Sequence, residues 1–330
     1  MQGLPKKVLF FQSECTDPYK NIAFEYGLLQ ACPKDAVAVY LWQNDHSVII
    51  GKNQNAWSEV HVAEFLADGG RIARRFSGGG AVYHDLKNLN FSFVAPKGIY
   101  DKAVNFQVII RALATLGINA ELTGRNDLVV DGKKISGNAF KNERHASLHH
   151  GTLLIDVDVA KMQKYLNVSK EKLATKGVKS VSSRVVNLKT FKPDLTAERL
   201  AQAIRRVCGE VFNAPCVDGR EEDFAWDGQR RTAELLRSAE WIFGRVADED
   251  FCVVSKRFDW GGVELAYKAQ GDVIKDLLLF SDSLDERLGQ LAVDNFVGKS
   301  FSQIASRAFD HQQLQDVANL LLQNYKPLTA

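Results

Sequence analysis

The sequence has no apolar run long enough to cross a membrane, and its N-terminal apolar stretch ends after Phe11. A membrane-spanning helix needs about 20 predominantly apolar residues. A secretory signal peptide needs a longer apolar region than this one, followed by a cleavage site of small residues. We therefore expect neither a membrane span nor an export signal.

Cysteine is also scarce and is not paired by spacing. The five cysteines are scattered over the chain, and no two of them form a C-x-x-C pair. Such a set suits neither a disulfide framework nor a zinc site, and it fits a reducing compartment. We expect a cytoplasmic protein.

Neither sign of charge is in excess, because 42 Lys and Arg stand against 40 Asp and Glu, a formal net charge of +2. A general binder of nucleic acid or of membrane surfaces relies on a strong field of basic residues. We therefore expect neither kind of partner.

Patterns of strands and helices alternate along the chain. Strands are expected at 36–42, 47–53, 71–75, 81–83 and 89–94, with the first two paired around the polar turn 43–46. Helices are expected at 20–31, 58–67 and 104–116, strands between 118 and 155, and helices from about 158 to 214. After a charged segment at 218–233, strands at 251–256, 262–268 and 273–280 and then two helices predict a separate small domain.

The strongest local motif runs from Arg74 to Asp85 and contains three successive glycines, Gly78 to Gly80. Glycines allow close backbone approach to a ligand, and consecutive N–H groups can bind an anion. The two arginines before them, Arg74 and Arg75, offer forked donors for a carboxylate or a phosphate. The alternative is a tight turn flanked by two solvated arginines.

This motif is not a standard nucleotide signature. The G-x-x-x-x-G-K-[ST] pattern is absent, because Gly298-Lys299-Ser300 is preceded by Val293 where the first glycine should stand. The G-x-G-x-x-G pattern fails at Tyr83. Neither ATP nor NAD can be assigned from these patterns.

A hairpin turning at Asp131-Gly132 carries the second motif. Because side chains alternate along a strand, Lys134 and Ser136 are expected on one face and Lys133 and Ile135 on the other. An inward lysine is costly unless it meets an anion. The alternative is that both lysines lie on an exposed turn.

Two further segments are weaker signals. His149 and His150 are adjacent on a predicted strand, so they face opposite ways and do not suit one metal ion. The segment 176–184 is basic and rich in hydroxyl groups, which fits a surface loop or a lid over phosphates. No G-x-S-x-G elbow is present and no cysteine lies in a motif, so we do not expect nucleophilic catalysis by the protein.

Taken together, these motifs resemble lipoate–protein ligases of the long form. The resemblance rests on RRFSGGGAVYHDLKNLNFSF, GRNDLVVDGKKISGNAF, HHGTLL and KGVKSVSSRVVNL, which follow in that order, and it extends over nearly the whole chain. It implies the α/β catalytic fold with mixed sheets that biotin ligases share, over residues 1–244. It also implies a C-terminal accessory domain over residues 245–330.

The resemblance implies a two-step reaction. Lipoate and ATP, with Mg²⁺, would form lipoyl-AMP and pyrophosphate. The lipoyl group would then pass to a lysine of lipoyl-domain proteins, namely 2-oxo acid dehydrogenase acyltransferase subunits and the glycine-cleavage H protein. No tightly bound cofactor is implied, and we expect a monomer.

Site residues follow from the matching positions, with Lys134 as the catalytic residue that contacts both ligands. Those implied for ATP and the adenylate are Arg75, Gly80, Ala81, Val82, Tyr83, Asn126, Asp127, Lys134, Lys176, Ser180 and Ser183, with Asp127 also near Mg²⁺. Those implied for lipoate are Trp42, Arg75, Ser77, Gly78, Gly79, Lys134, Gly137 and His150.

Two positions depart from the family pattern, and alternatives remain. Lys87 stands where glycine is frequent, and Lys141 stands where arginine occurs. A transferase that uses preformed lipoyl-nucleotide, and a lipoyl-binding protein without catalysis, are the competing functions. An octanoyltransferase would need a cysteine in a motif, and a biotin ligase a basic glycine-arginine loop. Residues 124–192 hold 14 Lys and Arg against 6 Asp and Glu, which suits ATP and an acidic acceptor surface.

Overall fold

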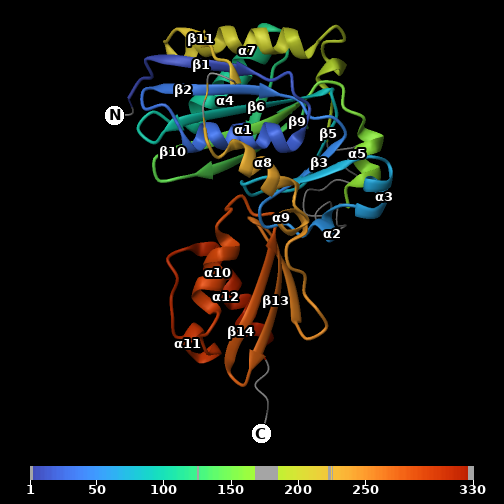
Figure 1. The fold of residues 1–330 in the computed structure, drawn as a ribbon, viewed down its shortest axis with the longest axis vertical. Coiled ribbons are helices and arrows are strands. Elements are labelled where there is room, and N and C mark those ends of the chain that lie inside the picture. The colour runs from blue at the N-terminus through green and yellow to red at the C-terminus, as the bar shows by residue number, and fades with distance from the viewer. Residues whose placement is uncertain (1–2, 125, 168–184, 222–223, 225, 326–330) are drawn as a thin grey trace.

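The structure, a computed structural model, describes residues 3–124, 126–167, 185–221, 224 and 226–325. Figure 1 shows two parts, an upper part with two sheets and a lower part that we call the C-terminal unit, residues 252–325. The mixed α/β class predicted from the sequence is confirmed.

The large sheet has eight strands in the order β11-β1-β2-β6-β10-β9-β8-β7, parallel at β11-β1-β2 and antiparallel elsewhere. All seven residues of β2 are buried, because both faces of the sheet are covered. The strands are β1 (Lys7–Gln12), β2 (Ala36–Trp42), β6 (Asn88–Pro96), β7 (Glu121–Thr123), β8 (Asp127–Val130), β9 (Lys133–Asn142), β10 (Ala146–Leu154) and β11 (Cys216–Asp218).

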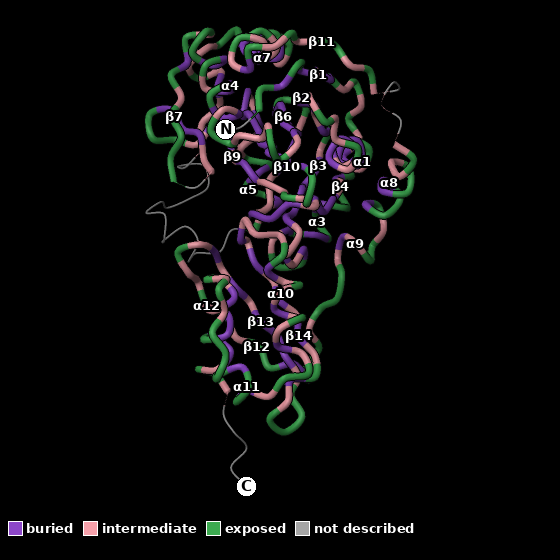
Figure 2. The backbone as a smooth tube through the Cα atoms, turned by 90° about the vertical axis from the view of Figure 1, so that its left-hand side faces the viewer, coloured by how far each residue is buried: buried purple, intermediate pink, exposed green. Residues whose placement is uncertain are grey.

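Helices cover the two faces of this sheet, and side chains of each strand alternate between them. Val37, Val39 and Leu41 of β2 join the core beneath α4 (Lys102–Thr115) and α7 (Ala197–Phe212). Ala38, Tyr40 and Trp42 join the core beneath α1 (Pro18–Gln30) and α8 (Gln229–Arg237). Figure 2 shows these buried segments running through the centre of the upper part.

A small sheet, in the order β4-β3-β5, lies against the second of these faces. Its own core includes side chains of the short helices beside it. The elements are β3 (Ser47–Ile50), α2 (Ala56–Glu59), α3 (Val62–Ala67), β4 (Arg71–Arg74), β5 (Val82–His84), α5 (Val159–Tyr165) and α9 (Ala239–Phe243). The short helix η1 (Leu188–Thr190) packs instead on the large sheet through Leu188.

The predicted pairing of 36–42 with 47–53 is wrong. The strands β2 and β3 form near the predicted positions, but β2 lies in the large sheet and β3 in the small one. The chain leaves one sheet and enters the other at the turn before β3, where His46 has a positive φ of 34°. A pocket can form between the two sheets for this reason.

The C-terminal unit has its own apolar core, built from the three-stranded sheet β12-β13-β14 and the helices packed on it. The sequence predicts two helices after the strands, and the structure has three in the described residues. The additional short helix, α11, begins with a capping box in which Ser300 and Gln303 bond reciprocally. The elements are β12 (Cys252–Phe258), β13 (Gly261–Gln270), β14 (Val273–Ser281), α10 (Leu288–Phe296), α11 (Phe301–Ala305) and α12 (Gln312–Asn324).

The segment 281–285, which begins at the last residue of β14, joins the C-terminal unit to the upper part. Asn53 accepts a hydrogen bond from the Ser281 N–H (2.8 Å) and donates to the Asp285 carbonyl (3.1 Å). The Gly79 N–H donates to the Ser283 carbonyl at 2.6 Å. These bonds bring the C-terminal unit onto the triple-glycine loop.

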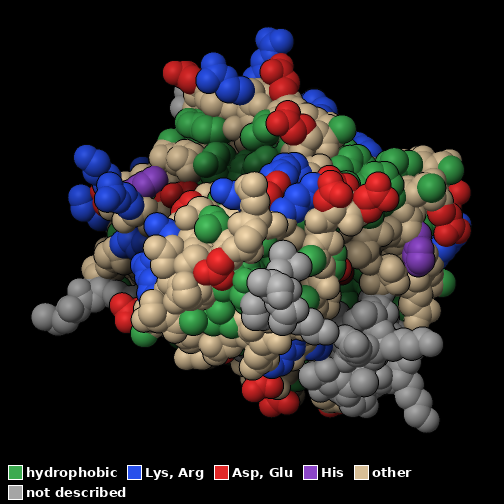
Figure 3. All heavy atoms as spheres, turned by 90° about the horizontal axis from the view of Figure 1, so that it is seen from below, with side chains coloured by type: hydrophobic (Ala, Val, Ile, Leu, Met, Phe, Trp, Pro, Cys, Tyr) green, Lys and Arg blue, Asp and Glu red, His purple; other side chains and the backbone are tan. Residues whose placement is uncertain are grey.

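Charges are mixed on the end of the molecule that carries the C-terminal unit. Figure 3 shows Lys and Arg side chains interspersed with Asp and Glu on the described part of this face. Among the described residues, no helix combines the length and the apolar character that crossing a membrane would require.

Candidate active site

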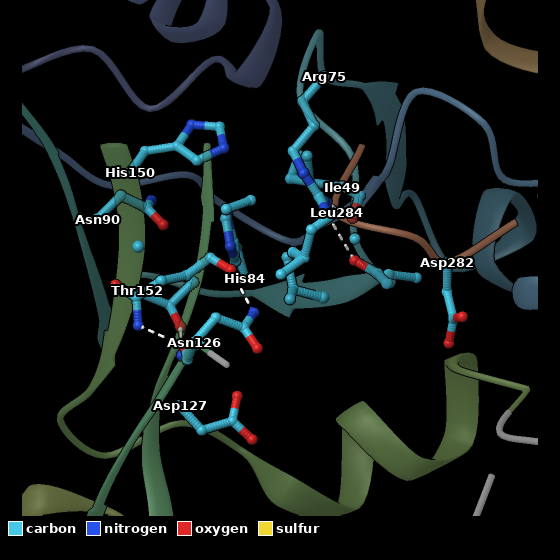
Figure 4. A pocket seen from close by; sticks show the side chains of 18 of the residues that line it. Ile49, Arg75, His84, Asn90, Asn126, Asp127, His150, Thr152, Asp282 and Leu284 are labelled. Atoms are coloured by element: carbon cyan, nitrogen blue, oxygen red, sulfur yellow. Dashed lines mark hydrogen bonds between the residues drawn. The ribbon is translucent and has the colours of Figure 1, made fainter. Parts of the chain in front are cut away.

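A cavity of about 170 Å³ lies between the two sheets and the C-terminal unit. In Figure 4, His150, Asn90 and Thr152 lie on one wall, Arg75, Ile49 and Leu284 on the other, and Asn126 and Asp127 at one end. The predicted site residues that line it are Trp42, Arg75, Gly79, Gly80, Ala81, Val82, Asn126, Asp127, Lys134, Gly137 and His150.

Lys134 lies in this cavity because of the local structure of the hairpin. Asp131 and Gly132 both have positive φ, 50° and 71°, as a two-residue type I′ turn requires. The Lys134 ammonium lies 2.8 Å from an Asp127 carboxylate oxygen, and both side chains are about one fifth exposed. The cavity therefore has a positioned cation with an anion at its side.

The prediction that Lys134 shares its face with Ser136 is wrong. Leu128 pairs with Ser136 but Val129 pairs with Lys134, so Ile135 is an additional residue on β9 and forms a β-bulge. Ile135 and Ser136 are both fully buried, whereas Lys134 and Gly137 line the cavity. The bulge thus separates the lysine from the serine.

Gly137 makes room for the lysine. A Cβ atom added at Gly137 would lie 2.8 Å from Lys134 Nζ and 3.0 Å from its Cε. Such distances are below ordinary van der Waals contact, so any side chain at this position would displace the ammonium group.

Arg74 and Arg75 are both buried, so the reading of two solvated arginines is wrong, and their guanidinium groups bond within the protein. Arg75 donates from Nε to Ser77 (3.0 Å), from Nη1 to the Ile49 carbonyl (3.1 Å) and from Nη2 to the carbonyls of Gly78 (2.6 Å) and Gly80 (2.8 Å). Three of these four bonds therefore hold the glycine loop, and the fourth ties the guanidinium to β3.

Arg74 also donates hydrogen bonds to backbone carbonyl groups, which belong to two segments. It bonds to carbonyls of Gly51, Lys52 and Gln54 and to those of Trp241 and Ile242. Burial lowers the pKa of each arginine to about 10, so both keep their charge at neutral pH. We conclude that Arg75 organises the glycine loop, and that Arg74 ties the segment 51–54 to α9.

A buried network forms the wall at the other end of the cavity. His150 Nδ1 lies 2.9 and 3.0 Å from the two Glu25 oxygens, and its Nε2 lies 2.6 Å from Ser77 Oγ. Ser92 donates to Glu25 and accepts from Trp42 Nε1 at 3.0 Å. The network fixes the indole and the imidazole that face the cavity.

The two adjacent histidines face opposite sides of β10, as predicted. His150 lines the cavity, whereas His149 lies among Phe91, Phe93 and Phe106 and bonds to Asn138 at 3.0 Å. Burial lowers the pKa of His149 well below its usual value, with the nearby His150 and Lys102 as further causes. His149 is therefore a neutral core residue.

Three predicted residues contact the site only indirectly. Tyr83 points away from the cavity, since Val82 and His84 take the inward positions of β5, and its hydroxyl lies 3.2 Å from His46 Nδ1. Ser77 is buried in the network of Arg75 and His150. Gly78 packs on the backbone of Ser283 and Leu284. Lys176, Ser180 and Ser183 lie outside the described residues.

Sequence reasoning missed several lining residues, among them Glu25, Asn90, His84, Arg257 and Leu284. His84 belongs to the glycine-rich motif, so a signal was present. Burial, with Arg75 and His150 nearby, lowers the pKa of His84 to about 3. The Asn44 amide nitrogen lies 3.1 Å from His84 Nδ1. Because the amide donates and Nδ1 accepts, the proton of the neutral His84 ring is on Nε2. Arg257 and Leu284 come from the C-terminal unit, about 200 residues along the chain from the loop they approach.

Asp127 lies at one end of the cavity, and its carboxylate is the group of the upper part that would bind a magnesium ion there. The described residues contain no group of three or more His, Cys, Asp or Glu side chains that could hold a metal ion. One carboxylate completed by substrate phosphates is a usual way to bind Mg²⁺. Asp127 therefore fits an ion that arrives with a nucleotide.

Comparison with known proteins identifies the family. Residues 17–208 match the family model "Lipoyl protein ligase A/B catalytic domain". The chain is 37% identical over 305 residues to lipoate-protein ligase A of Psychrobacter cryohalolentis, a match that covers 90% of each chain.

Solved structures agree with this match. P. falciparum LipL1, in complex with lipoate, is 28% identical with a TM-score of 0.84, over 96% of this chain and 100% of that one. A lipoate-protein ligase A bound with ATP is 25% identical with a TM-score of 0.61, over 74% and 100%. The bipartite lipoate protein ligase of Thermoplasma acidophilum, described together with its E2 lipoyl domain, is 27% identical with a TM-score of 0.63, over 75% and 99%. The chain therefore belongs to the lipoyl protein ligase A/B family, and it is a ligase.

Proposed function

We propose that this chain activates lipoate with ATP to lipoyl-AMP and then transfers the lipoyl group to a lysine of lipoyl-domain proteins. The acceptors would be 2-oxo acid dehydrogenase acyltransferase subunits and the glycine-cleavage H protein, in the cytoplasm. Residues 1–244 would form the catalytic domain and residues 245–330 the accessory domain. The observation that carries the proposal is Lys134, held beside Asp127 at one end of a cavity whose other end contains Trp42 and His150.

The spacing of the strands in the large sheet gives the length of this cavity. Trp42 on β2 pairs with Asn90 on β6, and Asn90 pairs with Thr152 on β10. The Gly137 N–H on β9 donates to Thr152 Oγ1 at 3.2 Å. Because neighbouring strands are about 4.8 Å apart, Asn90 and Gly137, two strands apart, are separated by about 10 Å.

Lipoate matches that length. Six bonds separate its carboxyl carbon from the nearer ring sulfur, and an extended chain advances about 1.2 Å per bond, so the two atoms are about 7 Å apart. A charge-assisted hydrogen bond to the ammonium adds about 2.8 Å. A carboxylate bound by Lys134 above Gly137 therefore places the dithiolane ring over Asn90 and beside Trp42.

In the first step, a carboxylate oxygen of lipoate attacks the α-phosphorus of ATP, the bond from that phosphorus to the bridging oxygen breaks, and pyrophosphate leaves. The carboxylate is already ionised, so no general base is needed. Lys134 donates hydrogen bonds to the carboxylate and to the α-phosphate and stabilises the charge that develops on phosphorus oxygens. Mg²⁺, held by Asp127 and the phosphates, would supply further charge neutralisation.

In the second step, the acceptor lysine amine attacks the acyl carbon, AMP leaves, and the amide forms with loss of a proton. The backbone of Gly79 to Val82, which lines the cavity, suits the phosphate of the adenylate because this loop can approach a ligand closely. The network of Trp42, Glu25 and His150 keeps the acyl end in place.

The test is lipoylation of a purified lipoyl domain, followed by intact-mass measurement. With lipoate, ATP and Mg²⁺ we expect one lipoyl group on one lysine of the acceptor, and no addition without ATP. Addition only from preformed lipoyl-AMP would favour the transferase, and no addition from either substrate would favour a binding protein without catalysis.

Replacing Gly137 by alanine should reduce activity without unfolding the protein. The new methyl group displaces the Lys134 ammonium, which lies at the flexible end of its side chain, so the strain on the fold is small. A displacement of about 1 Å at a reacting centre lowers the rate by about 100-fold. The measurement is kcat/KM for adenylate formation beside the melting temperature, and an unchanged kcat/KM would refute the positioning role of Gly137.

Replacing Trp42 by alanine should widen the acyl end of the cavity. The indole is 4% exposed, and the truncation costs about 3–5 kcal/mol of folding stability. We expect carboxylic acids bulkier than lipoate to become substrates while kcat/KM for lipoate falls. Activity profiles over a series of acids would show this, and an unchanged profile would mean that Trp42 does not limit the pocket.

A further inference from the structure

One arginine of the C-terminal unit reaches the candidate active site. Arg257, on β12, lines the cavity that contains Lys134, and it also lines a second cavity of about 210 Å³ between the upper part and the C-terminal unit. Its side chain is 19% exposed. Arg257 therefore borders both cavities.

The neighbours of Arg257 leave much of its hydrogen-bonding capacity for a ligand. Nη2 lies 3.5 Å from an Asp282 oxygen, which is longer than the 2.7–2.9 Å or so of a charge-assisted bond. The other Asp282 oxygen accepts the Gly262 N–H at 2.7 Å. Arg257 Nε is buried and has no hydrogen-bond partner among the described residues.

Arg257 differs in this respect from the other arginine of the first cavity. Among the described lining residues, Arg75, Lys134 and Arg257 are the Lys and Arg side chains. Arg75 makes four hydrogen bonds within the protein, three to its own loop and one to the Ile49 carbonyl of β3. Lys134 and Arg257 are therefore the two cations suited to contact a ligand.

The surroundings of Arg257 indicate a polyphosphate. Amides and hydroxyls line the second cavity, from Gln54, Asn55 and Ser58 among others. Its charged lining residues are Lys256, Arg257 and the carboxylates of Glu59, Glu264 and Asp282. The two cavities share Arg257 and Asp282 in their lining, whereas Trp42, at the acyl end, lines only the first. A guanidinium suits phosphate oxygens because its donors form a planar fork.

We propose that Arg257 binds the β- and γ-phosphates of ATP, the part that leaves as pyrophosphate, while Lys134 binds the α-phosphate. This inference rests on the proposed function. It means that the C-terminal unit takes part in binding the nucleotide. Tight ATP binding then requires the contacts by which segment 281–285 docks on the upper part. Gly262 leaves room for the Arg257 side chain, because a Cβ atom at Gly262 would lie 3.1 Å from Arg257 Nη1.

The test compares Arg257→Gln with the wild type in calorimetric titrations with MgATP and with magnesium pyrophosphate. Loss of a bidentate charge-assisted contact should weaken both about 10- to 100-fold. The KM for ATP should rise by a similar factor, and the KM for lipoate should not change. Transfer from preformed lipoyl-AMP to a lipoyl domain should keep its wild-type rate, because no pyrophosphate is present in that step.

Two further variants separate binding from folding. Arg257→Lys keeps the charge and should recover part of the affinity, and it serves as the readout if Arg257→Gln does not fold. Arg307→Gln removes an exposed arginine of the same unit and should bind as the wild type does. Wild-type affinity of Arg257→Gln for both ligands would overturn the inference, as would slowing of transfer to the same extent as adenylate formation. A wild-type chain that binds no ATP would overturn the proposed function as well, so the two failures are distinguishable.

Discussion

Replacing Lys134 by alanine should lower the rate of lipoyl-adenylate formation by at least about 100- to 1,000-fold, because the substitution removes a positioned cation from the developing charge. The fold should remain intact. Lys134 is paired with Asp127 at a partly exposed position, and such pairs contribute at most about 1 kcal/mol to stability. The measurement is adenylate formation in single turnover, with the melting temperature recorded in parallel.

The adjacent lysine provides a matched control for this variant. Lys133 lies one residue earlier on β9 and is exposed, so Lys133→Ala removes the same charge from the same turn without touching the cavity. We expect near wild-type rates from it. Near-normal adenylate formation by Lys134→Ala, or equal losses in the two variants, would remove Lys134 from the mechanism.

Replacing Gly78 by alanine should separate the C-terminal unit from the triple-glycine loop and thereby impair the first step. The new Cβ would lie 2.4 Å from the Ser283 carbonyl oxygen and 2.8 Å from the Leu284 carbonyl carbon and oxygen. All these atoms belong to the backbone, so no side-chain rotation relieves the collision. Either the segment 281–285 or the loop must move, and Arg257 and Leu284 move with that segment.

The expected loss of adenylate formation is about 100-fold, as for other displacements near an angstrom at a reacting centre. X-ray scattering should show a more extended molecule. Gly98→Ala is the control, because a Cβ at Gly98 has no heavy atom within 4 Å. A Gly78→Ala variant with wild-type scattering and wild-type rate would show that the contact has no role.

The local elements of the site could be predicted from the sequence because short-range rules determine them. Asp131-Gly132 defines the hairpin turn, and strand alternation correctly sends His149 and His150 to opposite faces. The same alternation fails for Ser136, since the bulge at Ile135 depends on pairing with β8. The alternation of side chains along one strand does not reveal where an additional residue is inserted relative to the neighbouring strand.

Contacts distant in the sequence could not be predicted in this way. Nothing near Arg75 indicates that its guanidinium bonds to the carbonyls of Ile49, Gly78 and Gly80. Leu284 enters the cavity only because the segment after β14 bonds to Asn53 and Gly79. Such placement follows from how the sheets and the C-terminal unit pack together.

The central claim is that this chain forms lipoyl-AMP in a cavity built around Lys134. Lipoate-dependent exchange of labelled pyrophosphate into ATP tests it most directly, because exchange requires reversible adenylate formation and needs no acceptor protein. We predict exchange by the wild-type chain that depends on lipoate and is lost in Lys134→Ala. No exchange by the wild type, or exchange that does not depend on lipoate, would contradict the account.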